Sequence, residues 1–311
     1  MNPLVDRFGR AVNYLRISLT QRCDYSCFFC HHEGEHQKGP EMTVEEIGNL
    51  VRAASRRGIR RVKLTGGEAL LREDFLDIVK SVAPLVDDLS LTTNGSRLEE
   101  MASELKDAGL DRVNVSLHTL DPATFVRITG RDNLEAVKRG IQTAVEVGLN
   151  PVKINMTILR NINENEIKAM MDFAGRTDAI LQLIELQYMP EENDAIWQRY
   201  WVDLESAEQK LELEASEVRK RSLHARKQYT VPLSHGEVVV EVVRPTHNSS
   251  FCESCTRLRM TSDGRLKPCL LRHDNLVDIR CLLGDDNPSS SVDGALVRAV
   301  EAREPYWRGE D

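Results

Sequence analysis

The 311-residue chain lacks the features that would place it in a membrane, on nucleic acid or outside the cell. No run of about eighteen apolar residues occurs, and the first ten residues contain no apolar stretch typical of a secretory signal. Basic residues are not in excess, because 41 Lys and Arg stand against 49 Asp and Glu. Aromatic residues make up only 5% of the chain, too few to indicate a platform for stacking bases. We therefore expect a cytoplasmic protein that binds neither nucleic acid nor membrane.

Each of the two cysteine groups in the chain lacks a fourth member. Six of the seven cysteines fall into two groups of three: Cys23, Cys27 and Cys30, and Cys252, Cys255 and Cys269. In a cytoplasmic chain such spacing indicates metal ligands rather than disulfides. Four thiolates close a structural zinc site or saturate a cubane iron–sulphur cluster, so three leave one position open to a small molecule. The seventh cysteine, Cys281, is expected in the core.

Strand-like and helix-like segments alternate six times before residue 188. We expect strands over residues 12–20, 61–65, 89–93, 112–117, 152–159 and 180–186. One intervening helix begins at a capping box of Thr43 and Glu46 and ends at Gly58. This alternation implies an α/β protein with a parallel sheet, either open and doubly wound or curled into all or part of a barrel.

Polar and glycine-rich motifs fall where these strands end. They are the first cysteine group, Gly66-Gly67-Glu68, Thr92-Thr93-Asn94-Gly95 and Ser116. Because the carboxyl ends of parallel strands share one edge of a sheet, we expect the motifs to lie on one functional face.

Beyond about Tyr188 the pattern changes, and we expect a second domain over residues 216–311. It contains a β-branched run over 238–243 and an Asp263-Gly264 turn typical of hairpins. Arg257 and Arg259 are two residues apart, so on a strand they face the same way and could clamp one phosphate chain. Taken alone, the cysteines here could also be a zinc site completed by His247 or His273.

Together these motifs resemble the radical S-adenosylmethionine (SAM) enzymes, and within them the GTP 3′,8-cyclases of molybdenum-cofactor biosynthesis. The resemblance spans nearly the whole chain. It rests on Asp6-Arg7-Phe8-Gly9-Arg10, Tyr14-Leu15-Arg16-Ile17-Ser18, the first cysteine group, Thr65-Gly66-Gly67-Glu68, and the second cysteine group with Cys255-Thr256-Arg257-Leu258-Arg259. The first cysteine group is typical of the superfamily, and the second, with its internal arginines, is typical of the cyclases.

The resemblance implies an incomplete (βα)6 TIM-type barrel over residues 1–215, with a C-terminal iron–sulphur-binding extension over 216–311. It implies two [4Fe-4S] clusters, the first chelating SAM and the second holding the guanine end of GTP. Reductive cleavage of SAM would give a 5′-deoxyadenosyl radical that takes hydrogen from ribose C3′ of GTP, and C3′ would close onto C8. The product, (8S)-3′,8-cyclo-7,8-dihydroguanosine 5′-triphosphate, would pass to a cyclic pyranopterin monophosphate synthase. A ferredoxin- or flavodoxin-like protein would supply the electron.

Individual positions can also be carried over from the family. Those matching SAM contacts are Phe29, Gly67 and Ser116. Those matching GTP contacts are Arg16, Lys63, Thr92, Lys153, Arg257, Leu258 and Arg259. Four or more cations from separate strand ends suit a triphosphate in a net-acidic protein.

The chain departs from the family pattern at several positions. Ala69 stands where proline is usual, and Lys63 and Phe29 stand where arginine and tyrosine are common. Gln182 and Gln187 replace an arginine and a methionine. The chain ends Arg308-Gly309-Glu310-Asp311, whereas most members end in two glycines.

Two other functions are compatible with the same motifs. One is a radical SAM enzyme with an auxiliary cluster that modifies a peptide, although the Arg257 and Arg259 pair favours a phosphorylated substrate. The other is a zinc-stabilised binding module without redox chemistry.

Overall fold

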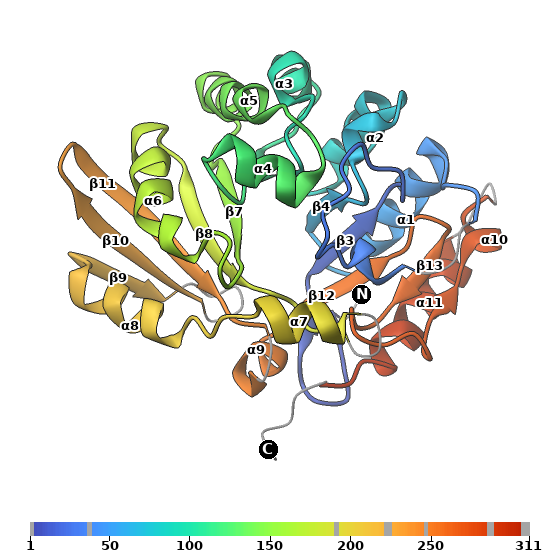
Figure 1. Cartoon of the computed structure of the whole chain (residues 1–311). Coiled ribbons are helices and arrows are strands. Elements are labelled where there is room, and N and C mark those ends of the chain that lie inside the picture. Colours follow the sequence, from blue (N-terminus) through green and yellow to red (C-terminus); the bar gives the residue numbers. More distant parts are fainter. Residues whose placement is uncertain are drawn as a thin grey trace.

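A strongly curved sheet with helices along its outer side forms the body of the molecule (Figure 1). The computed structural model describes residues 3–35, 39–189, 193–220, 226–245, 248–284 and 289–305. The six expected strands are all present: β3 (Tyr14–Ser18), β4 (Arg61–Thr65), β5 (Asp88–Thr93), β6 (Arg112–Ser116), β7 (Lys153–Ile158) and β8 (Ile180–Glu185). They are parallel and pair in chain order. The expected α/β alternation is therefore confirmed.

The helices that connect these strands cover the outer side of the sheet. They are α1 (Val44–Arg56), α2 (Phe75–Val82), α3 (Leu98–Asp107), α4 (Pro122–Thr129), α5 (Leu134–Glu146) and α6 (Ile167–Arg176). The capping box that begins α1 is confirmed, since Glu46 N donates to Thr43 Oγ1 at 3.1 Å and Thr43 N donates to Glu46 Oε2 at 2.7 Å. Helix α4 was not expected.

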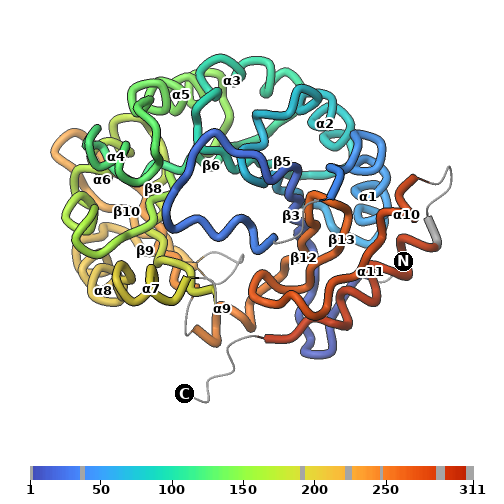
Figure 2. The backbone as a smooth tube through the Cα atoms, turned by 45° about the vertical axis from the view of Figure 1, so that its right-hand side comes forward, coloured from blue at the N-terminus to red at the C-terminus, as the bar shows by residue number. Residues whose placement is uncertain are grey.

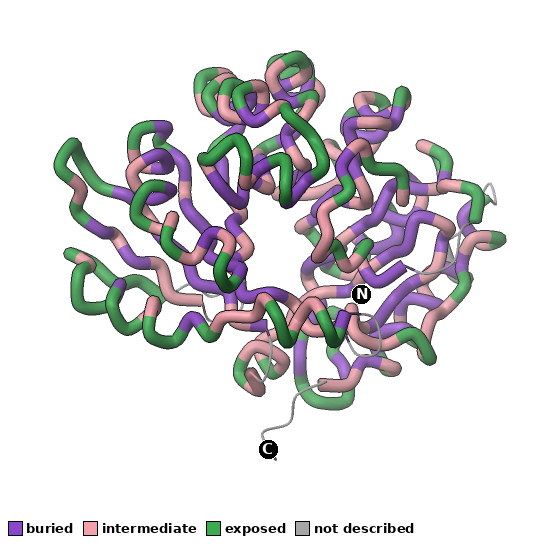
Figure 3. Tube along the Cα trace, in the orientation of Figure 1, coloured by how far each residue is buried: buried purple, intermediate pink, exposed green. Residues whose placement is uncertain are grey.

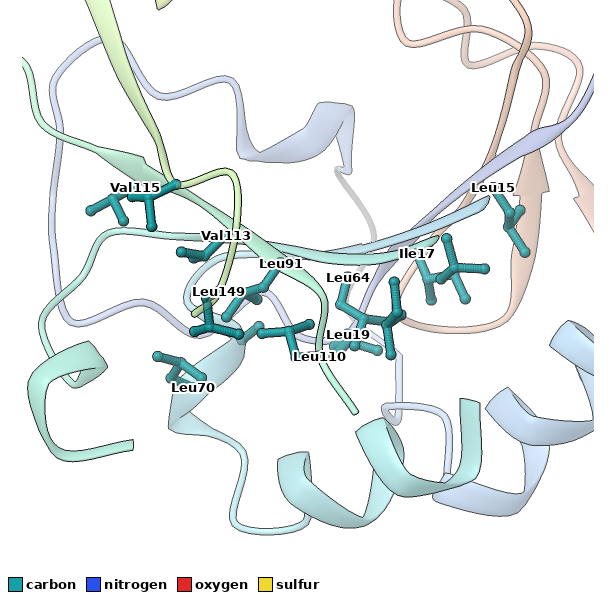
Figure 4. Close-up of a cluster of buried hydrophobic side chains, with 14 of the residues drawn as sticks. Leu15, Ile17, Leu19, Leu64, Leu70, Leu91, Leu110, Val113, Val115 and Leu149 are labelled. Carbon is teal, nitrogen blue, oxygen red and sulfur yellow. The ribbon is translucent and has the colours of Figure 1, made fainter. Parts of the chain in front are cut away.

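Alternation along each strand separates a hydrophobic face from a polar face. On β3, Leu15 and Ile17 are fully buried in the core, while Arg16 lies on the opposite face. Figure 4 shows the same outward direction for Leu64 and Leu91 on the neighbouring strands. The core thus lies between the sheet and the helices, where Figure 3 shows buried residues along the strands. The polar residues of the strands are left to line the inside of the curve.

The C-terminal part of the chain extends both edges of this sheet. Its elements are α7 (Asp194–Tyr200), α8 (Glu205–Glu214), β9 (Glu217–Lys220), β10 (Lys227–Leu233), β11 (Gly236–Val243), α9 (Ser249–Glu253), β12 (Arg257–Met260), β13 (Arg265–Lys267), β14 (Val277–Asp278), α10 (Arg280–Leu283) and α11 (Ser289–Glu301). In the described ranges, one twelve-stranded sheet runs in the order β14-β13-β12-β3-β4-β5-β6-β7-β8-β11-β10-β9. Strands β12 and β11 are parallel to β3 and β8. The result is a partial barrel whose outer strands, β14 and β9, are not joined by hydrogen bonds.

Two smaller expectations have different outcomes. The Asp263-Gly264 turn is confirmed, because it joins antiparallel β12 and β13 and Gly264 has a φ of 94°. The expectation of a core position for Cys281 is wrong. Cys281 is exposed on α10, a short helix that turns Leu283 inward instead.

Four short 3₁₀ turns and a separate N-terminal hairpin complete the described elements. The 3₁₀ turns are η1 (His32–Gly34), η2 (Ala69–Leu71), η3 (Ala83–Leu85) and η4 (Glu164–Glu166), and the hairpin is β1 (Leu4–Val5) with β2 (Ala11–Val12). None of the described helices is long and apolar enough to span a membrane.

Candidate functional site

The segment that carries the first cysteine group leaves β3 and crosses the open end of the ring of strands (Figure 2). It is fixed on the far side at the end of α4, where Ser26 N donates to Thr129 O at 2.9 Å. Arg131 Nε donates to Asp24 O at 2.6 Å, which adds a second anchor. Near its start, Gly67 N donates to Thr20 O at 2.7 Å. The cysteine loop is therefore held over the carboxyl ends of the parallel strands.

The three thiols of this loop lie near one another. Backbone N–H groups approach two of the sulphurs: Tyr25 N is 3.4 Å from Cys23 Sγ, and His32 N is 3.4 Å from Cys30 Sγ. Burial, and then the proximity of Cys30 and Cys23, raises the pKa of the Cys27 thiol to about 12. Three crowded thiolates need a positive group between them, and the iron of a cluster supplies one.

Gly67 packs directly against the backbone that leads into the cysteine loop. A Cβ at this position would collide with the carbonyl oxygen of Arg22, which itself accepts from Glu68 N at 2.7 Å. Only glycine allows this approach, so the motif after β4 is matched to the cysteine loop.

Two other residues expected at SAM lie on the same side of the barrel. Phe29 makes an edge-on contact with the ring of His118, with centroids 5.1 Å apart. Ser116 is half-buried at the end of β6, in register with Asn155.

Glu68, the last residue of the Thr65-Gly66-Gly67-Glu68 motif, is a buried carboxylate beside this loop. Its oxygens accept from Thr93 Oγ1 at 2.8 Å, Leu70 N at 3.0 Å and Asn94 N at 2.6 Å. Burial nevertheless outweighs these hydrogen bonds and raises the pKa of Glu68 to about 7.

The second cysteine group lies where α9 leads into β12. Cys252 is in α9, Cys255 N donates to Cys252 O at 3.2 Å, and Cys269 follows β13. Burial opposes ionisation of Cys255, but Arg257 and Arg303 outweigh it and lower the pKa of this thiol. The cationic surroundings thus favour a thiolate, the form that binds metal.

The zinc alternative depends on a histidine near this second group. The Nδ1 atom of His273 lies 3.0 Å from Lys267 Nζ, so this histidine contacts a lysine. His247 lies outside the described residues. In the ranges that the structure describes, no three His, Cys, Asp or Glu side chains are gathered so as to hold a single metal ion. All ligands of a zinc ion converge on one atom, whereas the thiolates of a cubane bind separate irons. The all-thiol donor set of each group fits an iron–sulphur cluster.

Two contacts join the segment that follows the first cysteine group to the segment between Cys255 and Cys269 of the second. Arg259 Nη1 lies 3.3 Å from Glu33 Oε2, and Lys267 Nζ donates to Gly34 O at 2.9 Å. Glu33 and Gly34 follow Cys30 within four residues, while Lys267 comes two residues before Cys269. The two cysteine groups, more than 200 residues apart in the chain, therefore adjoin the same end of the barrel.

Three of the residues expected at GTP form a row across adjacent strands. Arg259, Arg16 and Lys63 are direct register partners on β12, β3 and β4. Glu33 neutralises part of this row, because it lies 2.5 Å from Arg16 Nη2 as well as near Arg259. Burial would raise the pKa of Glu33, but the two arginines outweigh it and lower the pKa to about 2. All of these side chains except Lys63 line one small cavity.

A second row continues the polar face along the next strands. Thr92, Asn114 and Lys153 are register partners on β5, β6 and β7. The two rows are linked, since Lys63 Nζ donates to Asn114 Oδ1 at 2.6 Å. Lys153 forms a 2.6 Å ion pair with Glu241, whose carboxylate is fully buried on β11.

Positive charges are concentrated on this inner face. Burial, followed by the charges of Arg112, Arg16, Lys153 and Arg257, lowers the pKa of Lys63 well below its ordinary value. Burial and the charge of Arg226 lower the pKa of Arg257 to about 10. These basic groups destabilise one another's charged forms, and a bound polyanion would relieve that repulsion, so the face can bind a polyanion strongly.

Leu258 is the exception among the residues expected at GTP. It is fully buried in the hydrophobic core and pairs in register with Leu15. Its side chain lies on the face opposite to Arg257 and Arg259, so a contact with a ligand would have to come from its backbone.

The two glutamines that depart from the family pattern have defined surroundings. Gln182 accepts from Asn114 Nδ2 at 3.0 Å and donates to the carboxylate of Glu241. Gln187 donates to Tyr188 O at 2.9 Å and accepts through its backbone from Asn193 Nδ2 at 2.9 Å. The residues at the chain's end that replace the usual glycines lie outside the described residues.

Sequence reasoning missed Asn114, Glu33 and Glu241 as members of this face. Asn114 could have been found, because it alternates with Val113 and Val115 on an expected strand. Glu241 gave a weaker signal, as one charge within a β-branched run. Glu33 gave none, since it follows the cysteines in a segment without periodicity.

Comparisons with known proteins agree with these observations. A family model described as the Radical SAM superfamily matches residues 17–174, and one described as Molybdenum Cofactor Synthesis C matches residues 179–308. Proteins named "Probable GTP 3′,8-cyclase" are similar over nearly the whole chain. The one from Thermococcus kodakarensis is 53% identical, covering 98% of this chain and 100% of the relative. The one from Methanosarcina mazei is 49% identical, covering 98% of this chain and 90% of the relative.

Solved structures with the same fold are more distant in sequence. SuiB of Streptococcus suis bound to S-adenosylmethionine has a TM-score of 0.65 at 17% identity, covering 94% of this chain and 68% of SuiB. SuiB bound to its precursor peptide SuiA has a TM-score of 0.61 at 15% identity, covering 97% and 76%. At this level of identity the similarity establishes the fold alone.

Proposed function

Because the chain belongs to the radical SAM superfamily, and within it to the family of proteins named GTP 3′,8-cyclase, we propose that it converts GTP to 3′,8-cyclo-7,8-dihydroguanosine 5′-triphosphate. The observation that carries the proposal is the meeting of the two cysteine segments at Glu33–Arg259 and Gly34–Lys267. The basic row of Arg259, Arg16 and Lys63 and the polar row of Thr92, Asn114 and Lys153 lie on the inner face of the same sheet, which supports a ligand site there. GTP has a guanine end that can coordinate the open iron of a cluster and a triphosphate end that basic residues can bind, which suits such a site.

Membership of the superfamily implies SAM and an iron–sulphur cluster as cofactors. When bound, they would supply the one-electron cleavage of SAM and, through it, the removal of hydrogen from ribose C3′ of GTP. Our finer proposal is that there are two [4Fe-4S] clusters, one held by Cys23, Cys27 and Cys30, and one by Cys252, Cys255 and Cys269.

The chain's own residues bind and orient the two organic molecules. Gly67, Ser116 and Phe29 contact SAM under the cysteine loop. Arg16, Lys63, Lys153, Arg257 and Arg259 hold the phosphates, with Thr92 and the backbone of Leu258 beside them. Glu33 keeps the Arg16 and Arg259 guanidinium groups in place before substrate arrives, so less ordering is needed on binding.

The domain division and the partners remain part of the same proposal. We assign residues 1–215 to the radical SAM core and 216–311 to the unit that carries the second cluster. A ferredoxin- or flavodoxin-like protein supplies the electron, and a cyclic pyranopterin monophosphate synthase consumes the product. The peptide-modifying alternative is not favoured, because similarity to SuiB extends only to the fold.

Isotope transfer tests the activity directly. Anaerobic protein with reductant, SAM and GTP deuterated at C3′ should release 5′-deoxyadenosine that carries deuterium, together with the cyclised nucleotide. Cys27→Ala should abolish all SAM cleavage. Cys255→Ala should keep the slow cleavage that occurs without substrate but transfer no deuterium. Unlabelled deoxyadenosine, formed at one rate with and without GTP, would exclude GTP as the substrate.

A further inference from the structure

The turn that joins β1 and β2 is built around the carboxylate of Asp6. Its Oδ1 accepts from Phe8 N at 3.0 Å and from Arg10 N at 2.9 Å, and Gly9 supplies the positive φ of 78° that the turn requires. Its Oδ2 accepts from Arg10 Nε at 2.7 Å. The turn thereby fixes the direction of the Arg10 side chain.

A second arginine reaches the same carboxylate from the other end of the chain. Arg303 follows α11, and its Nη1 lies 3.0 Å from Asp6 Oδ2. Its side chain is 1% exposed, and it is the largest fully buried residue among those described. A charged side chain is rarely buried so completely unless its position matters.

Both arginines also bind the backbone of the second cysteine group. Arg10 Nη1 donates to Cys252 O at 2.9 Å, and Arg303 Nη2 donates to Cys255 O. Three segments that are distant in the sequence thus meet at these cysteines. The bonds fix the carbonyl groups that precede and follow the turn between Cys252 and Cys255.

Among Asp6, Arg10 and Arg303, one buried N–H donor is left without a hydrogen-bond acceptor in the described structure. Arg10 Nη2 is buried and has no acceptor among the residues that the structure describes. Leaving a buried charged donor unsatisfied is energetically costly, so native structures rarely contain one without a reason. Two guanidinium groups also share the single carboxylate of Asp6, which leaves positive charge next to the cysteines.

We propose that Asp6, Arg10 and Arg303 form a clamp that positions Cys252 and Cys255, and that Arg10 Nη2 donates a hydrogen bond to a sulphur of the iron–sulphur group held there. The inference rests on the proposed function for the existence of that group. Arg10 and Arg303 are positioning residues, because they act on the cluster and its ligands and not on substrate. Hydrogen bonds to cluster sulphurs stabilise the more negative, reduced state, so this bond raises the reduction potential of the second cluster.

The test compares Arg10→Lys and Arg10→Gln with wild type and with Arg7→Gln. Arg7 is a matched control, because it pairs with Glu304 and so joins the same two ends of the chain, but its side chain is 55% exposed and it contacts no cysteine in the described structure. Cys255→Ala gives the reference state with the second group broken. After anaerobic reconstitution, iron, sulphide and the electron paramagnetic resonance spectrum of the reduced protein are measured.

Wild type and Arg7→Gln should bind about eight irons per chain, whereas Arg10→Gln should fall toward the roughly four of Cys255→Ala. Arg10→Lys keeps the positive charge but loses the forked guanidinium group. It should therefore retain more iron than Arg10→Gln, and its second cluster should show an altered signal and a lower reduction potential than in wild type. SAM cleavage without GTP should be unchanged in all Arg10 variants, which shows that the first cluster and the fold are intact.

The two proposals fail differently. Wild type with about four irons overturns the second cluster and this inference together. Wild type with about eight irons, and Arg10 variants identical to it in iron content, spectrum and potential, overturns this inference alone and leaves the cyclase proposal standing.

Discussion

Lys63 lies in a position where its charge is costly without a ligand and favourable with one. Burial and four neighbouring cations lower the pKa of its ammonium group well below the ordinary value. A triphosphate beside it would reverse the balance and return the pKa toward that value. We predict that GTP binding takes up a proton at Lys63, so the affinity falls as pH rises above the lowered pKa of the free protein.

Calorimetric titration of GTP without reductant, in two buffers of different ionisation enthalpy, measures this uptake. Lys63→Met should take up close to one proton fewer than wild type. Lys80→Met is the control, because the Lys80 side chain is 63% exposed on α2. Equal proton uptake by Lys63→Met and wild type would show that Lys63 is already charged in the free protein.

The ion pair of Lys153 and Glu241 predicts a second residue-level effect. Both side chains are nearly inaccessible to water, at 4% and 0% exposure. Lys153→Met removes the cation 2.6 Å from the carboxylate of Glu241 and leaves it the guanidinium group of Arg226, whose Nη1 is 3.9 Å away. We expect the free energy of unfolding to fall, by at most the roughly 3–5 kcal/mol that an uncompensated buried charge costs. Lys153→Met with Glu241→Gln should recover most of this loss, since the amide oxygen of residue 241 can still accept from Gln182, and a turned Gln228 amide can accept from its new NH2 group.

Denaturant unfolding of the cluster-free protein provides the measurement. Lys138→Met, which removes the lysine of an exposed pair with Glu135 on α5, should change stability by less than about 0.5 kcal/mol. The interpretation fails if the double variant is as unstable as Lys153→Met alone.

Residue patterns predicted the cations of the site better than its anions. Arg16 and Lys63 stand at alternating positions of amphipathic strands, so their inward direction follows from the period of two. Glu241 pairs with a lysine 88 residues away, and Arg303 pairs with Asp6 across nearly the whole chain. Such partners depend on how distant strands and ends are placed in space, which local pattern does not encode.

At the level of elements, strands with strong local signals were predicted and those that depend on non-local pairing were not. The six central strands combine apolar alternation with helices on either side, and each expected range agrees with the observed one within about two residues. Strands β10 and β14 and the β1–β2 hairpin are short or weakly patterned. The C-terminal strands divide between two opposite edges of the sheet, and this division can be predicted only if the register of the whole sheet is known.

The contact of the cysteine loop with the turn after β4 gives a prediction about these elements. Gly67→Ala places a Cβ against the Arg22 carbonyl. Because both partners are backbone, the loop must move, and with it the cysteines that begin one residue later. We expect the variant to lose the first cluster, leaving about four of about eight irons per chain, and to cleave no SAM.

Gly284→Ala is the matched control, since a Cβ there would meet nothing within 4 Å and Gly284 has a negative φ of −85°. It should keep the wild-type iron content. A fully loaded Gly67→Ala protein would mean that the loop has room to shift while its cysteines keep their geometry.

In the molecule as a whole, the last third of the chain completes the sheet that the first two-thirds begin. Strand β12 covers the edge of β3, and β11 covers the edge of β8. Without them, two buried parallel strands would expose their hydrogen-bonding groups, a state that parallel sheets avoid. The two assigned domains should therefore unfold as one cooperative unit, even though their family models meet near residue 175.

Hydrogen exchange across a urea series can measure this coupling in the cluster-free full chain. Val240→Ala removes two methyl groups from a fully buried position on β11, which should cost about 2 kcal/mol. If the sheet is one unit, the urea midpoint for peptides of the distant strands β4 and β5 should fall by the same amount as for β11 itself. Val218→Ala, on the exposed outer strand β9, should leave both midpoints unchanged because Val218 is 42% exposed. A drop confined to β10 and β11 would instead show that the C-terminal unit opens on its own, and that the barrel core holds together with both edges uncovered.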